Sequence, residues 1–322
     1  MHRRLFLGLS AALAAPWTHA QIGAFEDETW LDAARSREVP VRLRWPSQEL
    51  PIPTGGLPVL LFSHGLGGTR EGGEVWGEAW GRAGFVVVHL QHRGSDLDGV
   101  RQAGGFGDTA RLRGVAGARE LLARLGDVRF ALDEVGRRHI AHQGRWSTVR
   151  PQAVGLAGHS FGAHTTLGMA GQSYPDFAGV DEPRLAAFIA FSPSLPLQNP
   201  EQAFARVTRP LLCITGTLDG DVLGTGASPE RRRAVYAALP AGHKAQLVLK
   251  DADHMSFAGQ TGRAVEILPR QSVSRDLQAA HHALIARLCT DWWRANLQAD
   301  DQARARLASP MGLVPGDDWR QG

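Results

Sequence analysis

Short apolar stretches recur along the chain, and each is followed by a polar or glycine-rich segment. Unbroken apolar runs of this length are typical of strands that are covered on both faces of a parallel sheet. An earlier stretch, Val39–Trp45, alternates apolar and polar residues instead, as a half-buried edge strand does, and its Pro40 also suits an edge. Buried strands are therefore expected at residues 58–62, 84–90, 153–158, 186–191, 210–215 and 245–250.

Segments with apolar residues three and four positions apart separate these strands and predict helices. Strands that alternate with helices indicate an α/β fold, with a mostly parallel central sheet and helices on both faces. We expect a single domain over residues 21–322, to which residues 127–150 or 255–271 could add a small cap. Helices are expected at 76–83, 109–125, 128–138, in a segment that ends at Ala170, and at 229–238, 274–296 and 300–307, with irregular connections at 94–107 and 139–150.

The first 20 residues have the pattern of a signal peptide. Arg3 and Arg4 precede an apolar run, Leu5–Ala15, that is too short to span a bilayer, and residues 18–20 form a small-x-small cleavage site. The paired arginines also fit the twin-arginine signal of bacteria, so the Sec and the twin-arginine routes both stay open. We therefore expect a bacterial periplasmic or secreted protein that meets the export machinery and keeps no membrane-spanning segment.

Charge and cysteine content narrow the classes of partner and cofactor. The 322 residues carry 35 Lys and Arg and 32 Asp and Glu, a formal net charge of +3 that falls to +1 without Arg3 and Arg4. Because the arginines are also scattered, nucleic acid is not expected as a partner. Two cysteines, Cys213 and Cys289, do not suffice for a zinc site, and the sequence leaves open whether they form a disulfide.

The stretch Ala153–Ala170 joins a predicted strand to a predicted helix through Gly158-His159-Ser160-Phe161-Gly162. This is the G-x-S-x-G pattern of a sharp turn that exposes a serine. Side chains at the two glycine positions would collide across so tight a turn. The following helix then directs unpaired N–H groups and partial positive charge at Ser160. In a chain with 38 glycines, however, the pattern indicates a nucleophile only if partners exist elsewhere.

Two such partners follow later strands. Asp219 and His254 each come directly after a predicted strand, and the carboxyl ends of parallel strands meet at one edge of a sheet. The order Ser160, Asp219, His254 is also the chain order of the α/β-hydrolase arrangement. His254 would take the hydroxyl proton of Ser160 and later give it to the leaving group, while Asp219 would orient the imidazole and stabilise its charged form.

Other residues compete for these roles. Asp221, two residues beyond Asp219, is a rival orienting acid, and Asp251 and Asp253 stand beside His254; Asp219 is preferred because it follows the strand. Roles in bracing loops are expected for His64 and His159, and packing roles for Trp76 and Trp80. His281 and His282 are adjacent on a predicted helix and point apart, so they are not expected to bind a metal, and no metal is assigned.

The oxyanion of an acyl-transfer intermediate needs two N–H donors. One is expected at Phe161, the residue after the nucleophile. The other is expected in the glycine-rich loop of residues 63–68, where we assign it to Leu66.

Three of these motifs resemble a known group. Phe62–Gly67, Gly158–Gly162 and Asp251–Phe257 are similar to the corresponding stretches of bacterial predicted dienelactone hydrolases and of the platelet-activating-factor acetylhydrolase group, α/β-hydrolases related to polyester-degrading cutinases. The similarity covers residues 37–258 or so. It implies the α/β-hydrolase fold and a serine esterase without metal or organic cofactor.

The chain also departs from this group. Dienelactone hydrolases use a cysteine where Ser160 stands, and poly(ethylene terephthalate) hydrolases carry an aromatic residue at the position of Leu66. They also place a tryptophan where Ser192-Pro193-Ser194 follows the strand here. We therefore expect an exported serine carboxylic-ester hydrolase for small-molecule esters with short acyl groups. Amide, peptide or polyester substrates, a catalytically silent binding protein of the same fold, and any oligomeric state stay open.

Overall fold

The computed structural model describes residues 25–262, 268 and 270–322. The expected signal peptide over residues 1–20 and part of the segment 255–271 therefore lie outside the described residues. The strands are β1 (Glu26–Asp32), β2 (Arg37–Arg44), β3 (Leu57–Ser63), β4 (Val86–Leu90), β5 (Val149–His159), β6 (Leu185–Phe191), β7 (Leu211–Leu218), β8 (Lys244–Asp253) and β9 (Asp318–Gln321).

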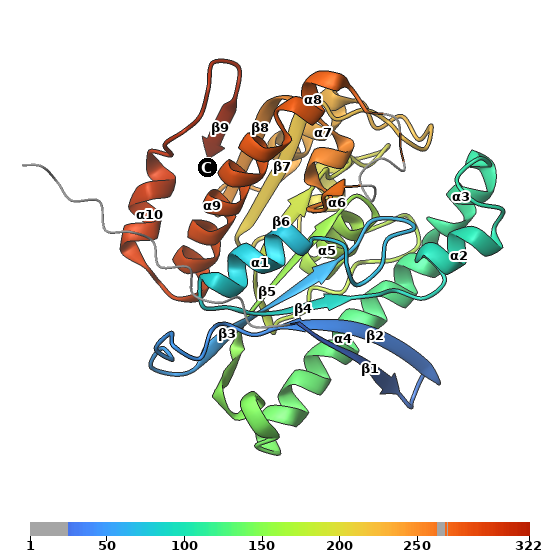
Figure 1. The fold of residues 1–322 in the computed structure, drawn as a ribbon. Helices are drawn as coiled ribbons and strands as arrows, with labels where there is room; N and C mark the ends of the chain where they lie inside the picture. Colours follow the sequence, from blue (N-terminus) through green and yellow to red (C-terminus); the bar gives the residue numbers. More distant parts are fainter. Residues whose placement is uncertain (1–24, 263–267, 269) are drawn as a thin grey trace, which may run out of the picture.

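The nine strands of the described residues form one sheet in the order β1-β2-β4-β3-β5-β6-β7-β8-β9, which Figure 1 shows as the centre of a mixed α/β structure. The neighbours from β4 to β8 pair in parallel. The pairs β1–β2, β2–β4 and β8–β9 are antiparallel. The mostly parallel sheet expected from the unbroken apolar runs is thus present, with antiparallel strands added at both ends.

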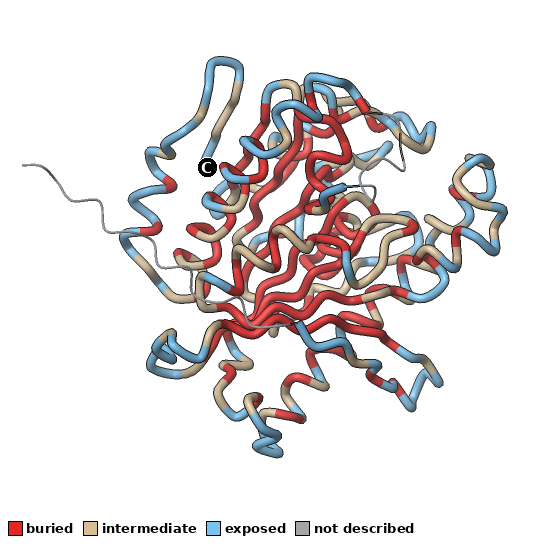
Figure 2. The backbone as a smooth tube through the Cα atoms, viewed as in Figure 1, coloured by how far each residue is buried: buried red, intermediate tan, exposed pale blue. Residues whose placement is uncertain are grey.

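Side chains that alternate along the parallel strands enter two separate cores, and the strands form the buried centre in Figure 2. In β3, Val59 and Leu61 pack with α4 (Ala118–Ile140), α5 (Phe161–Ala170) and α7 (Pro229–Ala238). Leu60 and Phe62 pack with α1 (Glu74–Arg82), α9 (Gln278–Leu297) and α10 (Asp301–Ala308). Helices therefore cover both faces, as predicted. The remaining helices are α2 (Leu97–Gln102), α3 (Thr109–Val115), η1 (Gly144–Thr148), α6 (Pro200–Phe204), η2 (His254–Phe257) and α8 (Ser272–Asp276).

The prediction of an edge strand at Val39–Trp45 is wrong. Strand β2 is paired on both sides, because β1, which the sequence analysis did not predict, lies outside it. Pro40 fits because its carbonyl accepts from the N–H of Gln91, just beyond the last residue of β4. The nitrogen and the carbonyl of one strand residue face the same neighbouring strand. The nitrogen of Pro40 therefore points towards the chain just beyond the end of β4, where no strand carbonyl needs an N–H donor.

The predicted break between helices 109–125 and 128–138 lies elsewhere. One helix, α3, ends at Val115, and α4 runs unbroken from Ala118 through Gly126 to Ile140. A glycine inside a helix costs about 1 kcal/mol relative to alanine. At Gly126 an added Cβ would lie 2.5 Å from the guanidinium of Arg35, so the missing side chain makes room for that cation. Residues 127–150 thus belong mainly to α4 and η1, and Val128 is part of the core.

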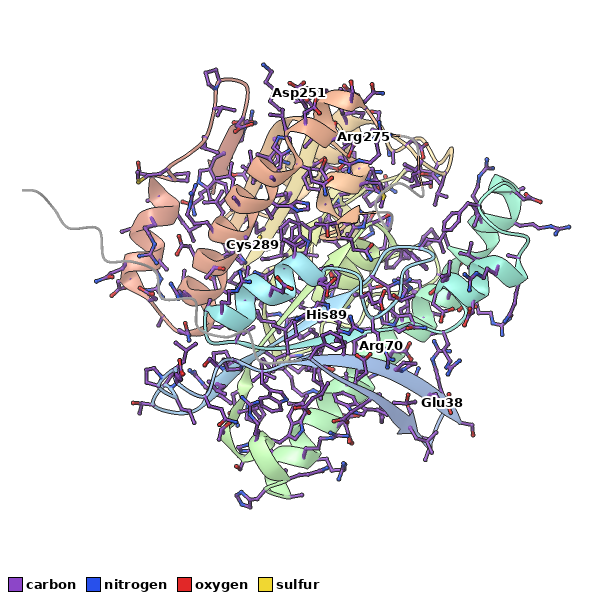
Figure 3. The ribbon with its side chains drawn as sticks, viewed as in Figure 1. Glu38, Arg70, His89, Asp251, Arg275 and Cys289 are labelled. Atoms are coloured by element: carbon purple, nitrogen blue, oxygen red, sulfur yellow. The ribbon has the colours of Figure 1, made fainter. Side chains whose placement is uncertain are left out.

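The two cysteines are free, and the sheet separates them. Cys213 in β7 packs in the core of α4, α5 and α7, whereas Cys289, labelled on α9 in Figure 3, packs in the opposite core. Burial raises the pKa of the Cys213 thiol to about 12.

No helix in the described part of the chain is both long enough and apolar enough to pass through a membrane.

We predict opposite effects for two Gly→Ala substitutions. At Gly155 in β5, an added Cβ would lie 2.6 Å from the ring of Trp293 and 3.0 Å from Leu60, so Gly155→Ala should destabilise the fold by about 1–3 kcal/mol. At Gly136, inside α4, an added Cβ meets nothing within 4 Å, so Gly136→Ala should stabilise by about 0.4–1 kcal/mol. Urea unfolding followed by tryptophan fluorescence measures both. Equal midpoints for the two variants would contradict the packing described for β5 against α9.

Candidate active site

Ser160 occupies the turn between β5 and α5 in a strained backbone conformation, with φ 56° and ψ −114°. Its N–H donates to the carbonyl of Phe191 in β6 at 3.0 Å, and its carbonyl accepts from the N–H groups of Ala163 and His164 in the first turn of α5. The turn is therefore anchored both to the neighbouring strand and to its own helix, and the Ser160 side chain stays partly exposed.

The two glycines of the turn are required for different reasons. A Cβ on Gly158 would lie 2.2 Å from the carbonyl oxygen of Gly162, which is the collision across the turn that the motif predicts. A Cβ on Gly162 would instead lie 1.9 Å from the carbonyl oxygen of Ser63 at the end of β3. The second glycine therefore lets the start of α5 pack directly on the neighbouring strand.

The structure brings Ser160, His254 and Asp219 together at the carboxyl ends of β5, β8 and β7. Nε2 of His254 lies 2.9 Å from Oγ of Ser160, and Nδ1 lies 2.8 Å from Oδ1 of Asp219. A carboxylate can only accept, so Nδ1 carries the proton and Nε2 is free to accept from the serine hydroxyl. His254 is 5% exposed and Asp219 is fully buried, which shields this hydrogen-bonded chain from water.

Asp219 stays ionised despite its burial. Burial by itself would raise the pKa of the carboxyl group, but Arg232, followed by His254, more than offsets this and holds the pKa below its ordinary value. Nε of Arg232 lies 3.1 Å from Oδ1, and Oγ1 of Thr215 donates to Oδ2 at 2.8 Å. A charged carboxylate at this position can accept the Nδ1 proton of His254 and hold the imidazole in one orientation.

The three rival carboxylates make contacts other than with the His254 imidazole. Asp221 is exposed and accepts N–H groups from Leu223 and Ala227 in its own loop. Asp253 caps η2 through the N–H of Ser256 and pairs with Arg270 at 3.0 Å. For Asp251, the contacts of the described chain are a backbone N–H bond to Thr217, a carbonyl bond from Ser274 and an ion pair with Lys250.

Leu66 and Phe161 both lie beside Ser160. Phe161 is the first residue of α5, where helical N–H groups have no intrahelical acceptor. Leu66 follows Gly65, whose position is so close to Ser160 that an added Cβ would lie 3.4 Å from the serine Cβ. Within the described residues neither N–H group donates to a carbonyl or to a side chain, so both are available to an oxygen at the site.

Most of the remaining predicted residues have bracing or packing contacts. His159 donates from Nε2 to the carbonyl of His254 at 3.0 Å, and burial lowers its pKa to about 3. His282 donates to the carbonyl of Ser256, and Trp76 stacks on Phe191 at 5.4 Å. Over the described ranges, no cluster of three or more His, Cys, Asp or Glu side chains is arranged to hold a metal ion.

A second hydrogen-bonded Ser–His–Asp chain lies nearby, and the sequence analysis missed it. Oγ of Ser63 lies 2.9 Å from Nε2 of His92, and Nδ1 of His92 lies 3.0 Å from Oδ2 of Asp127. All three residues are fully buried, and none lines a cavity beside Ser160. Ser63 lies in the glycine-rich loop motif, but that motif predicts an oxyanion donor and not a nucleophile, and Asp127 comes from a helix, so the sequence held no signal that links these three residues. Burial excludes it as a substrate site.

Two cavities meet at Ser160. The larger, of about 720 Å³, extends from Ser160 and His164 past α6 to the loop after β7, and its lining mixes polar and apolar side chains. The smaller, of about 90 Å³, contains His254 and Leu66 and is lined mainly by apolar residues and glycines. His254 lines the smaller cavity but not the larger one.

No family model matches the chain, and a search of curated proteins finds no relative.

We predict that histidines around the site make the fold less stable in acid. Burial, the main cause in each, lowers the pKa of His92 and His164 to about 4 and that of His159 to about 3. The unfolded chain gains these protons near its ordinary pKa of about 6.5, while the folded chain does not. The free energy of unfolding should therefore fall as the pH drops from about 6.5 towards 4. Urea unfolding at several pH values measures this.

The variant His159→Gln provides the check. It removes one group that titrates only in the unfolded chain, and its amide can still donate to the carbonyl of His254. The slope of unfolding free energy against pH should decrease by up to about 1.4 kcal/mol per pH unit. An unchanged slope would mean that His159 already takes up a proton in the folded protein.

Proposed function

We propose that the protein is a serine hydrolase of the α/β-hydrolase fold that cleaves carboxylic esters through an acyl-enzyme on Ser160. The observation that carries the proposal is the continuous hydrogen-bonded chain from Ser160 through His254 to Asp219, with distances of 2.9 and 2.8 Å, at a point where two cavities meet. The strained turn and the free N–H groups of Leu66 and Phe161 add support. The sheet order and the helices on both faces agree with this fold.

The proposed reaction uses each group at the atom where it lies. Nε2 of His254 takes the proton of the Ser160 hydroxyl as Oγ attacks the ester carbonyl carbon, and the carbonyl oxygen becomes an oxyanion. The N–H groups of Leu66 and Phe161 stabilise that charge. His254 then gives the proton to the alcohol oxygen as the C–O bond breaks. A water molecule, activated by the same imidazole, releases the acid and restores the serine.

The two cavities suggest how a substrate lies across Ser160. The leaving alcohol must be close to Nε2 of His254, because that nitrogen protonates it. His254 lines the smaller cavity, so we propose that the alcohol part lies there and that the acyl part lies in the larger one. Short acyl groups fit a cavity of about 720 Å³, which also leaves room for longer ones. The smaller cavity, of about 90 Å³, favours a compact, apolar alcohol.

We propose, from the sequence pattern of residues 1–20, that the enzyme is exported to the periplasm or secreted and acts on small-molecule esters there. Comparing cell fractions for the full chain and for a chain that begins at Gln21 tests this.

The triad assignment predicts a difference between two neighbouring carboxylates. Asp219→Asn should lower the kcat for p-nitrophenyl acetate by roughly 10³–10⁴, because the amide cannot hold His254 in the productive tautomer. Asp221→Asn should leave kcat within about two-fold, because the bonds of that side chain within the described structure are to its own loop. Ser160→Ala sets the baseline. Steady-state rates on the three variants and the wild type measure this.

Two outcomes would contradict the assignment. Equal rates for the wild type and Ser160→Ala would show that Ser160 is not the nucleophile. A fully active Asp219→Asn variant beside an inactive Asp221→Asn variant would show that Asp221 is the orienting acid. A fluorophosphonate that labels the wild type but not His254→Ala separates an enzyme from a catalytically silent binding protein. Matched ester and amide substrates separate an esterase from an amidase.

The cavity assignment predicts which half of an ester each wall restricts. Two ester series are compared, one lengthened in the acyl part and one in the alcohol part. Ala116→Trp narrows the larger cavity and should reduce kcat/KM selectively for long acyl groups, whereas Gln260→Trp narrows the smaller cavity and should do so for long alcohols. Each mismatch should cost about ten-fold or more. The reverse pattern would invert the proposed substrate orientation.

A further inference from the structure

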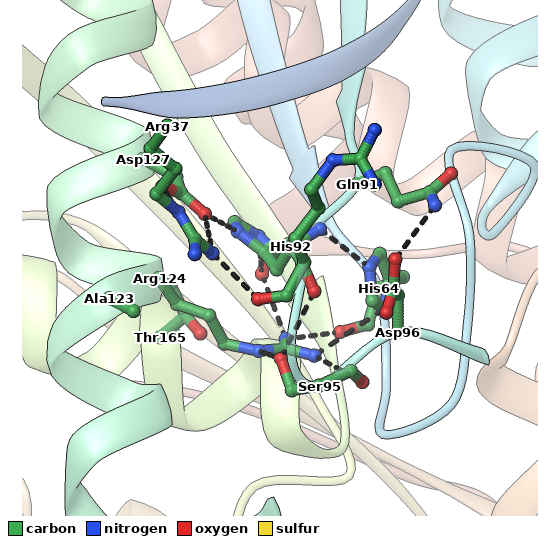
Figure 4. A network of polar contacts seen from close by, with 12 residues as sticks. Arg37, His64, Gln91, His92, Ser95, Asp96, Ala123, Arg124, Asp127 and Thr165 are labelled. Atoms are coloured by element: carbon green, nitrogen blue, oxygen red, sulfur yellow. Dashed lines mark hydrogen bonds and ion pairs between the residues drawn. The ribbon is translucent and has the colours of Figure 1, made fainter. Parts of the chain in front are cut away.

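Arg124 on α4 is a fully buried cation that contacts both segments expected to carry the oxyanion donors. Nη1 donates to the carbonyl of His64 at 2.6 Å, and Nη2 donates to the carbonyl of Gly65 at 3.3 Å. The guanidinium carbon also lies 4.3 Å from the ring centroid of Phe161. Figure 4 shows Arg124 within its network of polar contacts. Arg124 therefore connects the loop after β3 to the first residue of α5.

All five N–H groups of Arg124 have an acceptor. Besides the two carbonyls, Nη1 faces Oγ of Ser63 at 3.5 Å, Nε donates to Oγ of Ser95 at 2.8 Å, and Nη2 faces the Ser95 carbonyl at 3.5 Å. Burial lowers the pKa of Arg124 to about 9, which leaves it charged at neutral pH. A lysine has three donors on one nitrogen and could not reproduce this set of contacts.

The neighbouring histidine acts on the same carbonyl. The backbone N–H of His92 donates to Nε2 of His64 at 3.0 Å, so Nε2 accepts and the proton of this neutral ring is on Nδ1. Burial, reinforced by the charge of Arg124, holds the pKa of His64 well below its usual range. Nδ1 then donates to the carbonyl of Gly65 at 2.6 Å. The oxygen of Gly65 thus accepts from three donors: His64, Arg124 and the backbone N–H of Gly68 at 3.1 Å.

Fixing that oxygen also fixes the N–H of Leu66, because both belong to one peptide group. The peptide is planar, and no cis peptide bond occurs among the residues that the structure describes. In a trans peptide the C=O and the N–H point in opposite directions. Donors on the Gly65 oxygen also polarise the peptide group and make its N–H a stronger donor.

The buried Ser63–His92–Asp127 chain ends in a carboxylate that favours the charged form of Arg124. Asp127 pairs with Arg37 at 2.7 Å and with Arg35 at 2.8 Å, and burial is outweighed by His92 and Arg37, which lower its pKa to about 2. Its negative charge helps to keep Arg124 protonated, as do the charges of Asp96 and Glu120. The second Ser–His–Asp chain therefore contributes to stabilising a cation.

We propose that Arg124 is a positioning residue for the oxyanion hole. It orients the Gly65–Leu66 peptide and the start of α5 so that the N–H groups of Leu66 and Phe161 point at one oxygen. This inference rests on the proposed esterase function, because it assigns Arg124 a role in stabilising the negative charge of the tetrahedral intermediate. Arg124 itself does not touch the substrate.

The test compares Arg124→Lys and Arg124→Gln with Arg138→Lys, a control at another buried arginine of the same helix that pairs with Glu134. Removing an oxyanion donor costs about 10²–10³ in rate, and a misaligned donor should cost roughly 10–10². We expect kcat for a p-nitrophenyl ester to fall by that factor in both Arg124 variants, with KM within about three-fold and the control near wild type. Arg124→Gln carries no buried charge and keeps the test valid if Arg124→Lys does not fold.

A second readout separates positioning from general stability. A trifluoromethyl ketone forms a tetrahedral adduct with a serine and places an oxyanion between the two donors, so its inhibition constant should rise by the same factor as kcat/KM falls. Urea unfolding shows whether a variant is folded under the assay conditions, and so whether a fall in kcat reflects only a loss of folded protein. Unchanged kcat and inhibition constant in a folded Arg124 variant would overturn the positioning role alone. A wild type that hydrolyses no ester would instead overturn the proposed function.

Discussion

The arrangement of the site depends on one close contact, where the first turn of α5 packs on the end of β3. An added carbon at Gly162 would lie 1.9 Å from the carbonyl oxygen of Ser63, so nothing larger than hydrogen fits there. The contact places Ser160 beside Gly65, the residue that precedes Leu66. A serine, two N–H groups without an acceptor among the described residues and the end of a helix are therefore close together because two backbones touch.

Two Ser–His–Asp chains with nearly equal hydrogen-bond lengths occur in the described structure, and these lengths alone do not distinguish them. Ser160 is half-buried and lines both cavities, while Ser63 is fully buried and lines neither. The strained backbone is also confined to one of them, since Ser160 has φ 56° and Ser63 lies in a regular strand. Access and strain, rather than the identity of the three side chains, favour the Ser160 chain as the reactive one.

The local pattern of apolar and polar residues predicted the buried parallel strands and the residues that follow them. Each buried parallel strand follows from an unbroken apolar run, and Ser160, Asp219 and His254 follow from their places after strands. Strand β1 was missed because EDETWLD is largely polar, and β9 because it has four residues and gains its pairing from β8. The continuity of α4 through Gly126 and the contacts of Arg124 depend on distant segments, such as Arg35 beside Gly126 and the loop after β3 beside Arg124, that no local pattern encodes.

Two buried arginines bind the loops that follow four of the parallel strands. Arg124 donates to carbonyl oxygens after β3 and β4, and Arg232 donates to those of Ser192 and Asp219 after β6 and β7. Loop carbonyls at strand ends have no ladder partner, and one guanidinium can satisfy several of them. Burying a charge costs free energy that an apolar side chain of similar size would not. Buried arginines therefore contribute little to stability, but they fix the directions of the peptide groups to which they donate. Their positions on either side of Ser160 fit a site whose proposed chemistry depends on where N–H groups point.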